Sequence, residues 1–473
     1  MKKLLFIQFL IPLLFKVAFS QTDIVGDWEG KIITPVISFD INIRFVSNGQ
    51  SFHGNISIPE QGANNLPLSN VLYNFPEIKF DLDVPDAKAF FDGKIYNKDS
   101  IAGSFKQLGF KGIFYLLRVV ETKIQLQPDF LIREEKVIFF NGINKFEGTL
   151  TIPNKLQGEK YPVLILITGS GAQTRDEEIA GFKVFKVLAE HFTKNGIAVL
   201  RYDDRNTGNS IGISIDSSTT EDFADDVISA VEYLSSRNDI NSNLIGLLGH
   251  SEGGIVASIT ASKCKNIAFV ICMAGTGVSG KDIILEQTKL IQQVSKKDTF
   301  DIQVTEKFLQ RMIETSISDT GWEEIRFELR SKLEEEYDKL ADDVKSFYQS
   351  KENFVEKMTN SQINIFKSRW MKFFLTYNPV ESLKQVKCPV LLLFGGKDLQ
   401  VPYYQNEKPM LEALQKAENN DVTLKVFWEA NHLFQKAETG LPSEYKDLKK
   451  EFVEGFLDFV TAWILTKVKL LNK

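Results

Sequence analysis

One serine stands in a motif that can turn it into a nucleophile. Residues 244–254 read LIGLLGHSEGG, an apolar run that leads directly into the pattern G-x-S-x-G around Ser251. A buried strand that enters this sharp turn lifts the serine hydroxyl clear of a sheet, where it can attack a carbonyl carbon. The five-residue pattern alone is only suggestive. Ser251 is therefore a candidate nucleophile, and its partners must be sought elsewhere in the chain.

A serine nucleophile needs a histidine base, and the chain has four histidines. His53 lies in an N-terminal region with a different residue pattern, and His191 lies within a predicted helix on the flank of the sheet. His250 directly precedes the serine, so its side chain is expected to point away from the hydroxyl. His432 follows the last predicted sheet strand, where a loop can place an imidazole over the strand ends, and it is the candidate base.

Asp398 is the candidate carboxylate that orients the base. It follows a buried strand after the short Gly395-Gly396 loop, which places it at the same edge of the sheet as the serine. The alternative is a turn aspartate that bonds its own backbone. The chain order Ser251, Asp398, His432 matches one class of triad scaffold and differs from the order in two others.

The oxyanion of an acyl-transfer reaction needs two backbone donors. One is expected to be the N–H of Glu252, which follows the nucleophile at a helix N-terminus. The other is expected from the loop 168–171, TGSG, with Ser170 as first choice and Gly171 as second. A phosphate-binding loop is the alternative there, but the lysine and the Ser or Thr that it requires are missing.

The elements around these residues predict an α/β fold with a doubly wound, mostly parallel sheet. Apolar runs of strand length alternate with helical stretches, and ligands of such sheets bind at the carboxyl ends of the strands. Strands are predicted at 146–152, 163–168, 197–202, 244–248, 268–273, 390–394 and 422–428, and helices at 182–194, 220–234, 405–416 and 445–465.

A long insertion interrupts this alternation at about residues 277–383. It is charged, helical in pattern and almost free of glycine, and it is too long for an ordinary connection. We expect a helical lid. Near its end lies an aromatic cluster, Arg369-Trp370, Phe373-Phe374 and Tyr377; core packing is the favoured role, and a wall of the substrate pocket is the alternative.

The N-terminal part of the chain has two further segments. Residues 1–20 carry a charged start, an apolar stretch and a small-x-small site before Gln21, which predicts a signal peptide cleaved after Ser20. An uncleaved membrane anchor is the alternative. Residues 21–130 alternate apolar and polar side chains between frequent turns, which predicts an antiparallel β domain, either a sandwich or a partial barrel. The hydrolytic region would then span residues 131–473.

Composition excludes several partners. The net charge of −6 and the absence of a broad basic patch argue against nucleic acid. Three scattered cysteines, Cys264, Cys272 and Cys388, favour free thiols over a disulfide scaffold or a metal site. No metal or organic cofactor is expected, and no stable membrane span remains once the signal is cleaved. The oligomeric state cannot be inferred.

From about residue 135 onward the chain resembles the α/β-hydrolase superfamily, in particular its bacterial serine-esterase and serine-aminopeptidase-like group. The segments that carry the resemblance are ITGSG at 167–171, RYDDR at 201–205, GHSEGG at 249–254, GGKDLQVP at 395–402 and NHLF at 431–434. The resemblance implies the same triad, Ser251, Asp398 and His432. One departure is Asn206 where relatives often have glycine; asparagine tolerates the left-handed conformation.

These observations favour a secreted or periplasmic serine hydrolase that cleaves small carboxylic esters through an acyl-enzyme. Asp203, Asp204 and Arg205 are expected to brace the loop beside the site. The Glu252 carboxylate would repel anionic substrates and attract an amine, which keeps a serine aminopeptidase-like peptidase as the first alternative. A thioesterase, an acyltransferase or a non-catalytic binding protein are the others.

Overall fold

The protein, seen here as a computed structural model, divides into two compact units, the first ending at Val119. The structure describes residues 24–34, 38–58, 61, 63–84, 87–97, 100–119, 131–154 and 160–471. The predicted signal peptide and the connection at 121–130 lie outside the described residues. Among the helices of the described part, none is long and apolar enough to cross a membrane.

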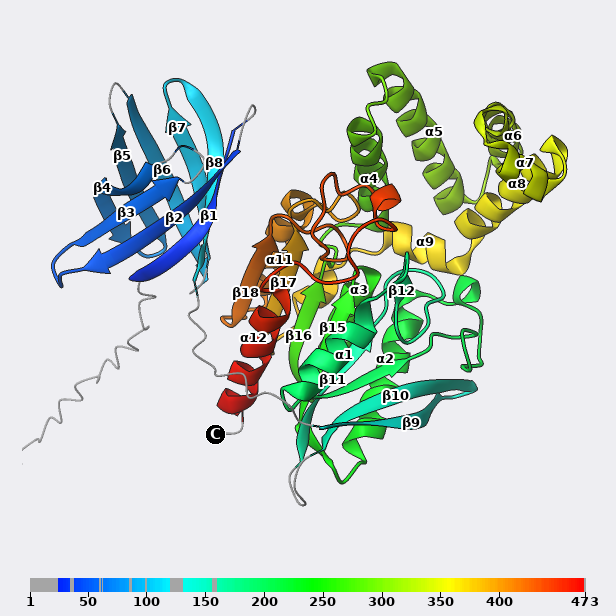
Figure 1. The fold of residues 1–473 in the computed structure, drawn as a ribbon, viewed down its shortest axis with the longest axis horizontal. Helices are drawn as coiled ribbons and strands as arrows, with labels where there is room; N and C mark the ends of the chain where they lie inside the picture. Colours follow the sequence, from blue (N-terminus) through cyan, green and yellow to red (C-terminus); the bar gives the residue numbers. More distant parts are fainter. Residues whose placement is uncertain are drawn as a thin grey trace, which may run out of the picture. The chain divides into compact units, whose positions relative to one another are not determined.

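The first unit is a closed antiparallel barrel in which each strand pairs with the next and β1 pairs with β8 (Figure 1). The alternating residues Ile41, Ile43 and Phe45 point inward, because side chains of a strand alternate between its two faces. The predicted sandwich is therefore wrong, and the predicted partial barrel is a closed one. The strands are β1 (Gly26–Ile33), β2 (Ser38–Ser47), β3 (Phe52–Ile58), β4 (Ala63–Asn74), β5 (Glu77–Val84), β6 (Ala87–Asn97), β7 (Ser100–Gln107) and β8 (Phe110–Arg118).

The second unit is built on an eight-stranded, mostly parallel sheet with the order β18-β17-β16-β15-β11-β14-β10-β9. Only β10 runs opposite to the other strands of this sheet, since it pairs antiparallel with both β9 and β14. Strands such as β11 and β16 are apolar along nearly their whole length, because both faces of the sheet are covered. The strands are β9 (Leu131–Asn141), β10 (Asn144–Asn154), β11 (Tyr161–Ile167), β14 (Ala198–Tyr202), β15 (Ile240–His250), β16 (Ile267–Met273), β17 (Val390–Gly395) and β18 (Val422–Phe427).

Helices cover both faces of this sheet, as the doubly wound prediction requires. Helices α1 (Val184–Lys194) and α12 (Phe456–Leu471) share one apolar core with the strands, which includes Phe185, Phe192 and Phe456. Helices α2 (Thr220–Ser235), α3 (Glu252–Lys263) and α11 (Tyr403–Lys416) contact the sheet from the other face. The carboxyl ends of the parallel strands thus remain as the open edge where loops can build a site.

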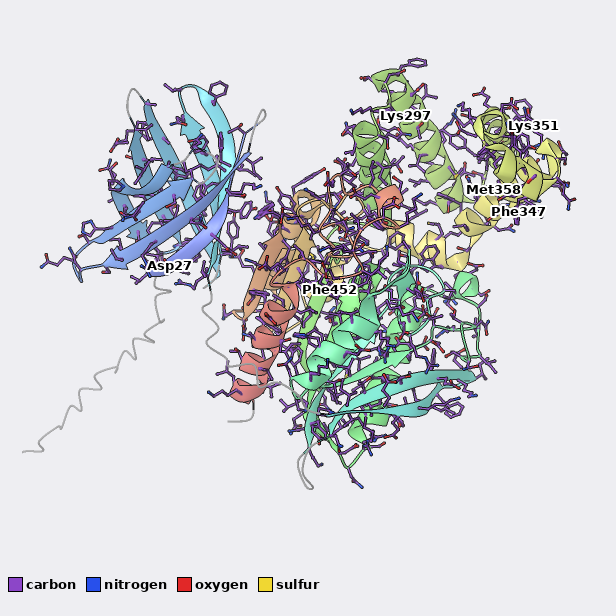
Figure 2. All side chains as sticks on the ribbon, in the orientation of Figure 1. Asp27, Lys297, Phe347, Lys351, Met358 and Phe452 are labelled. Carbon is purple, nitrogen blue, oxygen red and sulfur yellow. The ribbon has the colours of Figure 1, made fainter. Side chains whose placement is uncertain are left out.

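The insertion between β16 and β17 is entirely helical in its regular structure. Part of it has a small apolar core of its own, to which Phe308, Leu329 and Phe354 contribute. Figure 2 shows Lys297, Phe347, Lys351 and Met358 on this lid. Its helices are α4 (Gly280–Val294), α5 (Thr299–Ser318), α6 (Trp322–Lys339), α7 (Asp342–Tyr348), α8 (Lys351–Lys367), α9 (Arg369–Thr376) and α10 (Val380–Leu383).

One helix boundary differs from the sequence prediction. The last helix begins at Phe456 and not at about residue 445. The chain before Gly455 packs against the loop after β18 instead, where the Val453 N–H donates to the Phe434 carbonyl. Helix α2 begins at Thr220, as predicted, and its N-cap is Thr219, which forms a reciprocal capping box with Asp222.

Candidate active site

Ser251 stands at the turn between β15 and α3. Its backbone has φ 54° and ψ −120°, a strained conformation that a non-glycine residue rarely adopts. Both glycines of the motif are needed here: a Cβ on Gly249 would lie 1.9 Å from the Gly253 carbonyl oxygen, and one on Gly253 would lie 2.3 Å from that of Ile167. The packing of the turn therefore explains the pattern G-x-S-x-G and presents the serine at the sheet edge.

The structure brings Asp398 and His432 together, although they are 34 positions apart in the sequence. Asp398 follows β17 and His432 follows β18, and Oδ2 of Asp398 lies 2.7 Å from Nδ1 of His432. Oδ1 of Asp398 accepts hydrogen bonds from the N–H groups of Gln400 and Val401 at 2.8 and 2.9 Å. The carboxylate is fully enclosed, so its orientation and that of the imidazole are both fixed.

Ser251 and His432 line the same cavity of about 500 Å³. This volume is typical of small-molecule sites. The serine hydroxyl has no hydrogen-bond partner among the described residues, and contacts between nucleophile and base are often loose before a substrate is bound. The lid contributes apolar walls to the cavity, including Ile283, Trp370 and Phe374. Two residues of the aromatic cluster, Trp370 and Phe374, therefore form part of the cavity wall.

The two candidate oxyanion donors flank Ser251. Glu252 is the first residue of α3, so its N–H is one of the unpaired donors at a helix N-terminus. Ser170 follows β11, and it lines the cavity together with Gly169. The Gly169 N–H is already engaged by Oε1 of Glu177 at 2.8 Å, which leaves Ser170 as the better donor of that loop.

Comparison with known proteins places this site in a family. A model described as serine aminopeptidase, S33, matches residues 181–438, more than half of the chain. The chain belongs to the serine aminopeptidase S33 family. It therefore has the α/β-hydrolase fold, and the family model includes the positions of all three candidate triad residues.

Several individual proteins are similar to this S33 family member. Esterase EstD from Thermotoga maritima is 26% identical over 402 residues, which cover 83% of this chain and 79% of EstD. Thiohydrolase aneE from Aspergillus aculeatus is 34% identical over 123 residues, 25% of this chain and 36% of aneE. Among solved structures, Pyrococcus furiosus esterase Pf2001 is 17% identical, with a TM-score of 0.43. The match covers 72% of this chain and 91% of the Pf2001 chain.

In this S33 chain the Glu252 carboxylate does not face the substrate cavity. It is buried and accepts hydrogen bonds from Thr220 Oγ1 at 2.6 Å, Ser170 Oγ at 2.7 Å and Trp370 Nε1 at 2.9 Å. Burial raises its pKa, and these three donors counteract that rise. The expectation that Glu252 would repel anions or attract an amine is therefore wrong; the carboxylate ties the lid helix α9 to the nucleophile turn.

His250 and Glu177 form a buried pair that sequence reasoning missed. Nδ1 of His250 lies 2.9 Å from Oε1 of Glu177, and its Nε2 lies 3.0 Å from the carbonyl oxygen of His432. Burial alone lowers the pKa of His250, but the Glu177 carboxylate outweighs this and raises it above 6.5. A protonated His250 donates from both nitrogens, so it fixes the loop that carries the candidate base. No local pattern marks Glu177, which lies 73 residues upstream of His250.

Replacing Glu177 by Gln should lower the stability of the protein relative to wild type, and this loss should be larger at low pH than at high pH. The Gln Oε1 can still accept from Gly169 N and His250 Nδ1, so the change removes mainly the charge. A base with a raised folded-state pKa adds stability that is present below about pH 6.5 and is lost as the pH rises through the raised value. We expect Tm to fall by about 4 °C at pH 6 and by less than half of that at pH 9.

The matched control is Glu178→Gln, the same change at the exposed neighbouring residue, which lies 3.6 Å from Lys183. Its effect on Tm should be small at both pH values. Calorimetry of the three proteins at pH 6 and pH 9 measures the effect. An equal loss of Tm at both pH values would contradict a charged His250.

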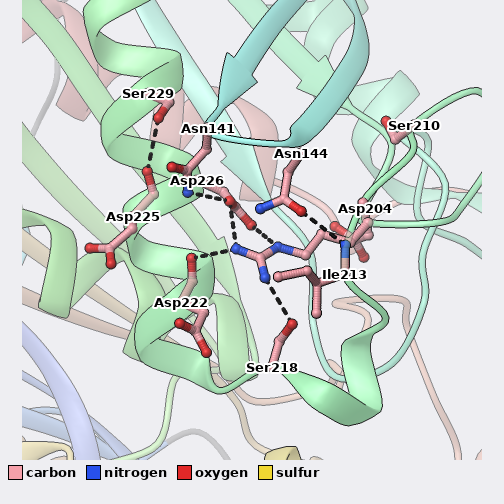
Figure 3. A network of polar contacts seen from close by, with 12 residues as sticks. Asn141, Asn144, Asp204, Ser210, Ile213, Ser218, Asp222, Asp225, Asp226 and Ser229 are labelled. Atoms are coloured by element: carbon pink, nitrogen blue, oxygen red, sulfur yellow. Dashed lines mark hydrogen bonds and ion pairs between the residues drawn. The ribbon is translucent and has the colours of Figure 1, made fainter.

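The loop that begins at Asp203, directly after β14, braces the site, as the sequence suggested. Arg205 binds both carboxylate oxygens of Asp226 at 2.6 and 2.8 Å and donates to Ser218 Oγ at 2.8 Å, which joins the loop to α2 (Figure 3). Asp204 accepts hydrogen bonds from Thr168 Oγ1 and from the N–H of Gln173, so it holds both ends of the segment 168–173, which carries Ser170. Asn206 has φ 55°, the left-handed conformation expected of it.

Proposed function

We propose that this S33 family member is a serine-dependent carboxylic ester hydrolase. His432 takes the proton of Ser251 as Oγ attacks the ester carbonyl, and Asp398 stabilises the imidazolium. The N–H groups of Glu252 and Ser170 bind the oxyanion. His432 then protonates the departing alcohol, and a water molecule, activated by the same imidazole, releases the acid from the acyl-enzyme.

The observation that carries the proposal is the fixed Asp398–His432 pair, whose imidazole lines one cavity with a serine held in the strained turn conformation. Each group is placed by a different strand end, so packing of the sheet orients them before any substrate binds. Such preorganisation is the main source of catalysis in acyl transfer. The similarity to Esterase EstD over most of both chains supports the ester as substrate.

The charge of the cavity favours an ester over an aminopeptidase substrate. An aminopeptidase needs a carboxylate to bind the free ammonium group of its substrate, because burying that charge without a partner is costly. Among the described lining residues, Glu177 is the only carboxylate, and it is fully buried and engaged with His250 and Gly169. The Glu252 carboxylate is engaged as well. The cavity therefore suits an uncharged acyl group.

A thioester is the second candidate substrate. A thioester differs from an ester only in its leaving group, and the same serine, base and oxyanion donors serve both reactions. The name of the fungal relative, a thiohydrolase, gives this candidate its specific support. A protein that only bound its ligand would not need the enclosed Asp398–His432 pair.

We also propose that the protein acts outside the cytoplasm, secreted or in the periplasm, on a small-molecule ester. The support is the sequence of residues 1–20 alone, with its charged start, apolar stretch and small-x-small site. An N-terminal sequence of the exported protein that begins at Gln21 would support the export, and an intact Met1 on the native protein would contradict it.

Esters should be turned over far faster than anilides. We expect kcat/KM for p-nitrophenyl butyrate to exceed that for alanine p-nitroanilide by at least about a hundredfold, since the cavity offers no free carboxylate for the ammonium group. N-acetylalanine p-nitroanilide is the control that lacks the ammonium. Preference for the free-amine anilide over both other substrates would contradict the ester hydrolase and establish the aminopeptidase.

A further inference from the structure

The N-terminal barrel contains a cavity of about 400 Å³ that the proposed hydrolysis does not use. Every one of its eight strands contributes at least one lining residue, so the cavity lies inside the barrel, toward one end of it. Eight strands make a barrel whose interior is either filled by side chains or holds one small ligand. The volume lies within the range of small-molecule sites.

The two halves of the barrel interior are packed differently. In one half, aromatic rings fill the space: Phe80 contacts Phe45, Phe91 and Phe114 at ring-centroid distances of 4.6–5.5 Å. The other half is lined in part by small residues such as Ala63 and Ala89 and is hollow. Protein interiors are normally close-packed, so an apolar hollow of this size is a place where a small ligand can bind.

The lining indicates the chemistry of that ligand. Most of the lining side chains are apolar, the polar ones are Thr34, Gln61 and Gln107, and none of the described lining residues carries a charge. Two of the apolar residues, Leu108 and Phe110, are also 70% and 59% exposed, so the cavity has an apolar lip. A charged ligand group inside would have no ion-pair partner among these residues, whereas the amides of Gln61 and Gln107 can bond an alcohol or an ester.

We infer that the barrel is a binding site for one small, uncharged, mainly apolar molecule with a polar head group, such as a medium-chain alcohol or ester. An engineered cavity of about 150 Å³ holds one benzene molecule, so a cavity of this volume holds about sixteen non-hydrogen atoms by the same scale. This site is distinct from the serine site, since all of its described lining residues belong to the first unit.

The test uses the full chain and the neutral fluorescent probe N-phenyl-1-naphthylamine. Leu66→Trp adds bulk to a lining residue of β4 and should weaken probe binding at least about tenfold. Leu72→Trp is the matched control, the same change on the same strand at a side chain that is 65% exposed, and should bind as wild type does. Near-ultraviolet circular dichroism, which is sensitive to the packed aromatic rings of the barrel, verifies that each variant is folded; Val84→Trp, at another lining residue, replaces Leu66→Trp if the latter is not.

Binding in the folded cavity variant as tight as in wild type would overturn the site, because the probe would then occupy another part of the protein. Competition tests the chemistry of the ligand. Decan-1-ol should displace the probe at concentrations at least about tenfold lower than decanoate at neutral pH. Equal displacement by the two compounds would overturn the preference for an uncharged head group.

Discussion

The Ser251→Ala protein is expected to lose between about 10⁴-fold and 10⁶-fold in kcat for p-nitrophenyl butyrate. The reason is the geometry of the turn: Ser251 presents its hydroxyl at the end of β15, in a conformation that the packing of Gly249 and Gly253 enforces. The cavity and the backbone donors remain in the variant, so KM should change little. The loss should therefore appear almost entirely in kcat.

A covalent readout separates loss of the nucleophile from general damage. A fluorophosphonate probe should label wild type at one residue and should not label Ser251→Ala. Ser262→Ala is the matched control, the same change in helix α3, which follows the turn; its hydroxyl donates to the Ile259 carbonyl. It should keep both labelling and turnover. Equal labelling of wild type and Ser251→Ala would show that another residue is the nucleophile.

Short sequence patterns predicted the parts of this fold that depend on residues close together in the chain. The strand before Ser251 and the loops that carry Asp398 and His432 are each readable from an apolar run followed by turn residues. Because parallel strands end at one edge, these three loops could be assigned to the same site without knowledge of their contacts. The structure places Asp398 beside His432 at that edge.

Contacts between distant residues could not be predicted in the same way. The contact of Trp370 with Glu252 spans 118 residues, and that of His250 with the His432 carbonyl spans 182. Both depend on how the lid and the sheet edge pack, which no short motif encodes. Closure of the barrel between β1 and β8 is equally non-local, so alternation in the sequence predicted the strands but not whether the sheet closes.

Asp398→Asn tests the orienting role of the carboxylate with almost no change in shape. Oδ1 of Asp398 accepts two backbone N–H groups, from Gln400 and Val401, so the amide oxygen of the substituted side chain must take that position. Its NH₂ group then faces Nδ1 of His432, where Oδ2 of the aspartate lies at 2.7 Å in wild type. An NH₂ group can only donate, so Nδ1 must accept and the imidazole proton moves to Nε2. A protonated Nε2 cannot take the proton of Ser251.

We therefore expect Asp398→Asn to lower kcat for p-nitrophenyl butyrate by about 10⁴-fold, with KM nearly unchanged. The fluorophosphonate labelling rate should fall with kcat, because both reactions need the same activated hydroxyl. Asp225→Asn is the matched control, since that exposed carboxylate pairs with Lys263 on the surface at 3.0 Å. A merely structural Asp398 would give a lower Tm with labelling preserved in the folded fraction, and that result would remove the carboxylate from the mechanism.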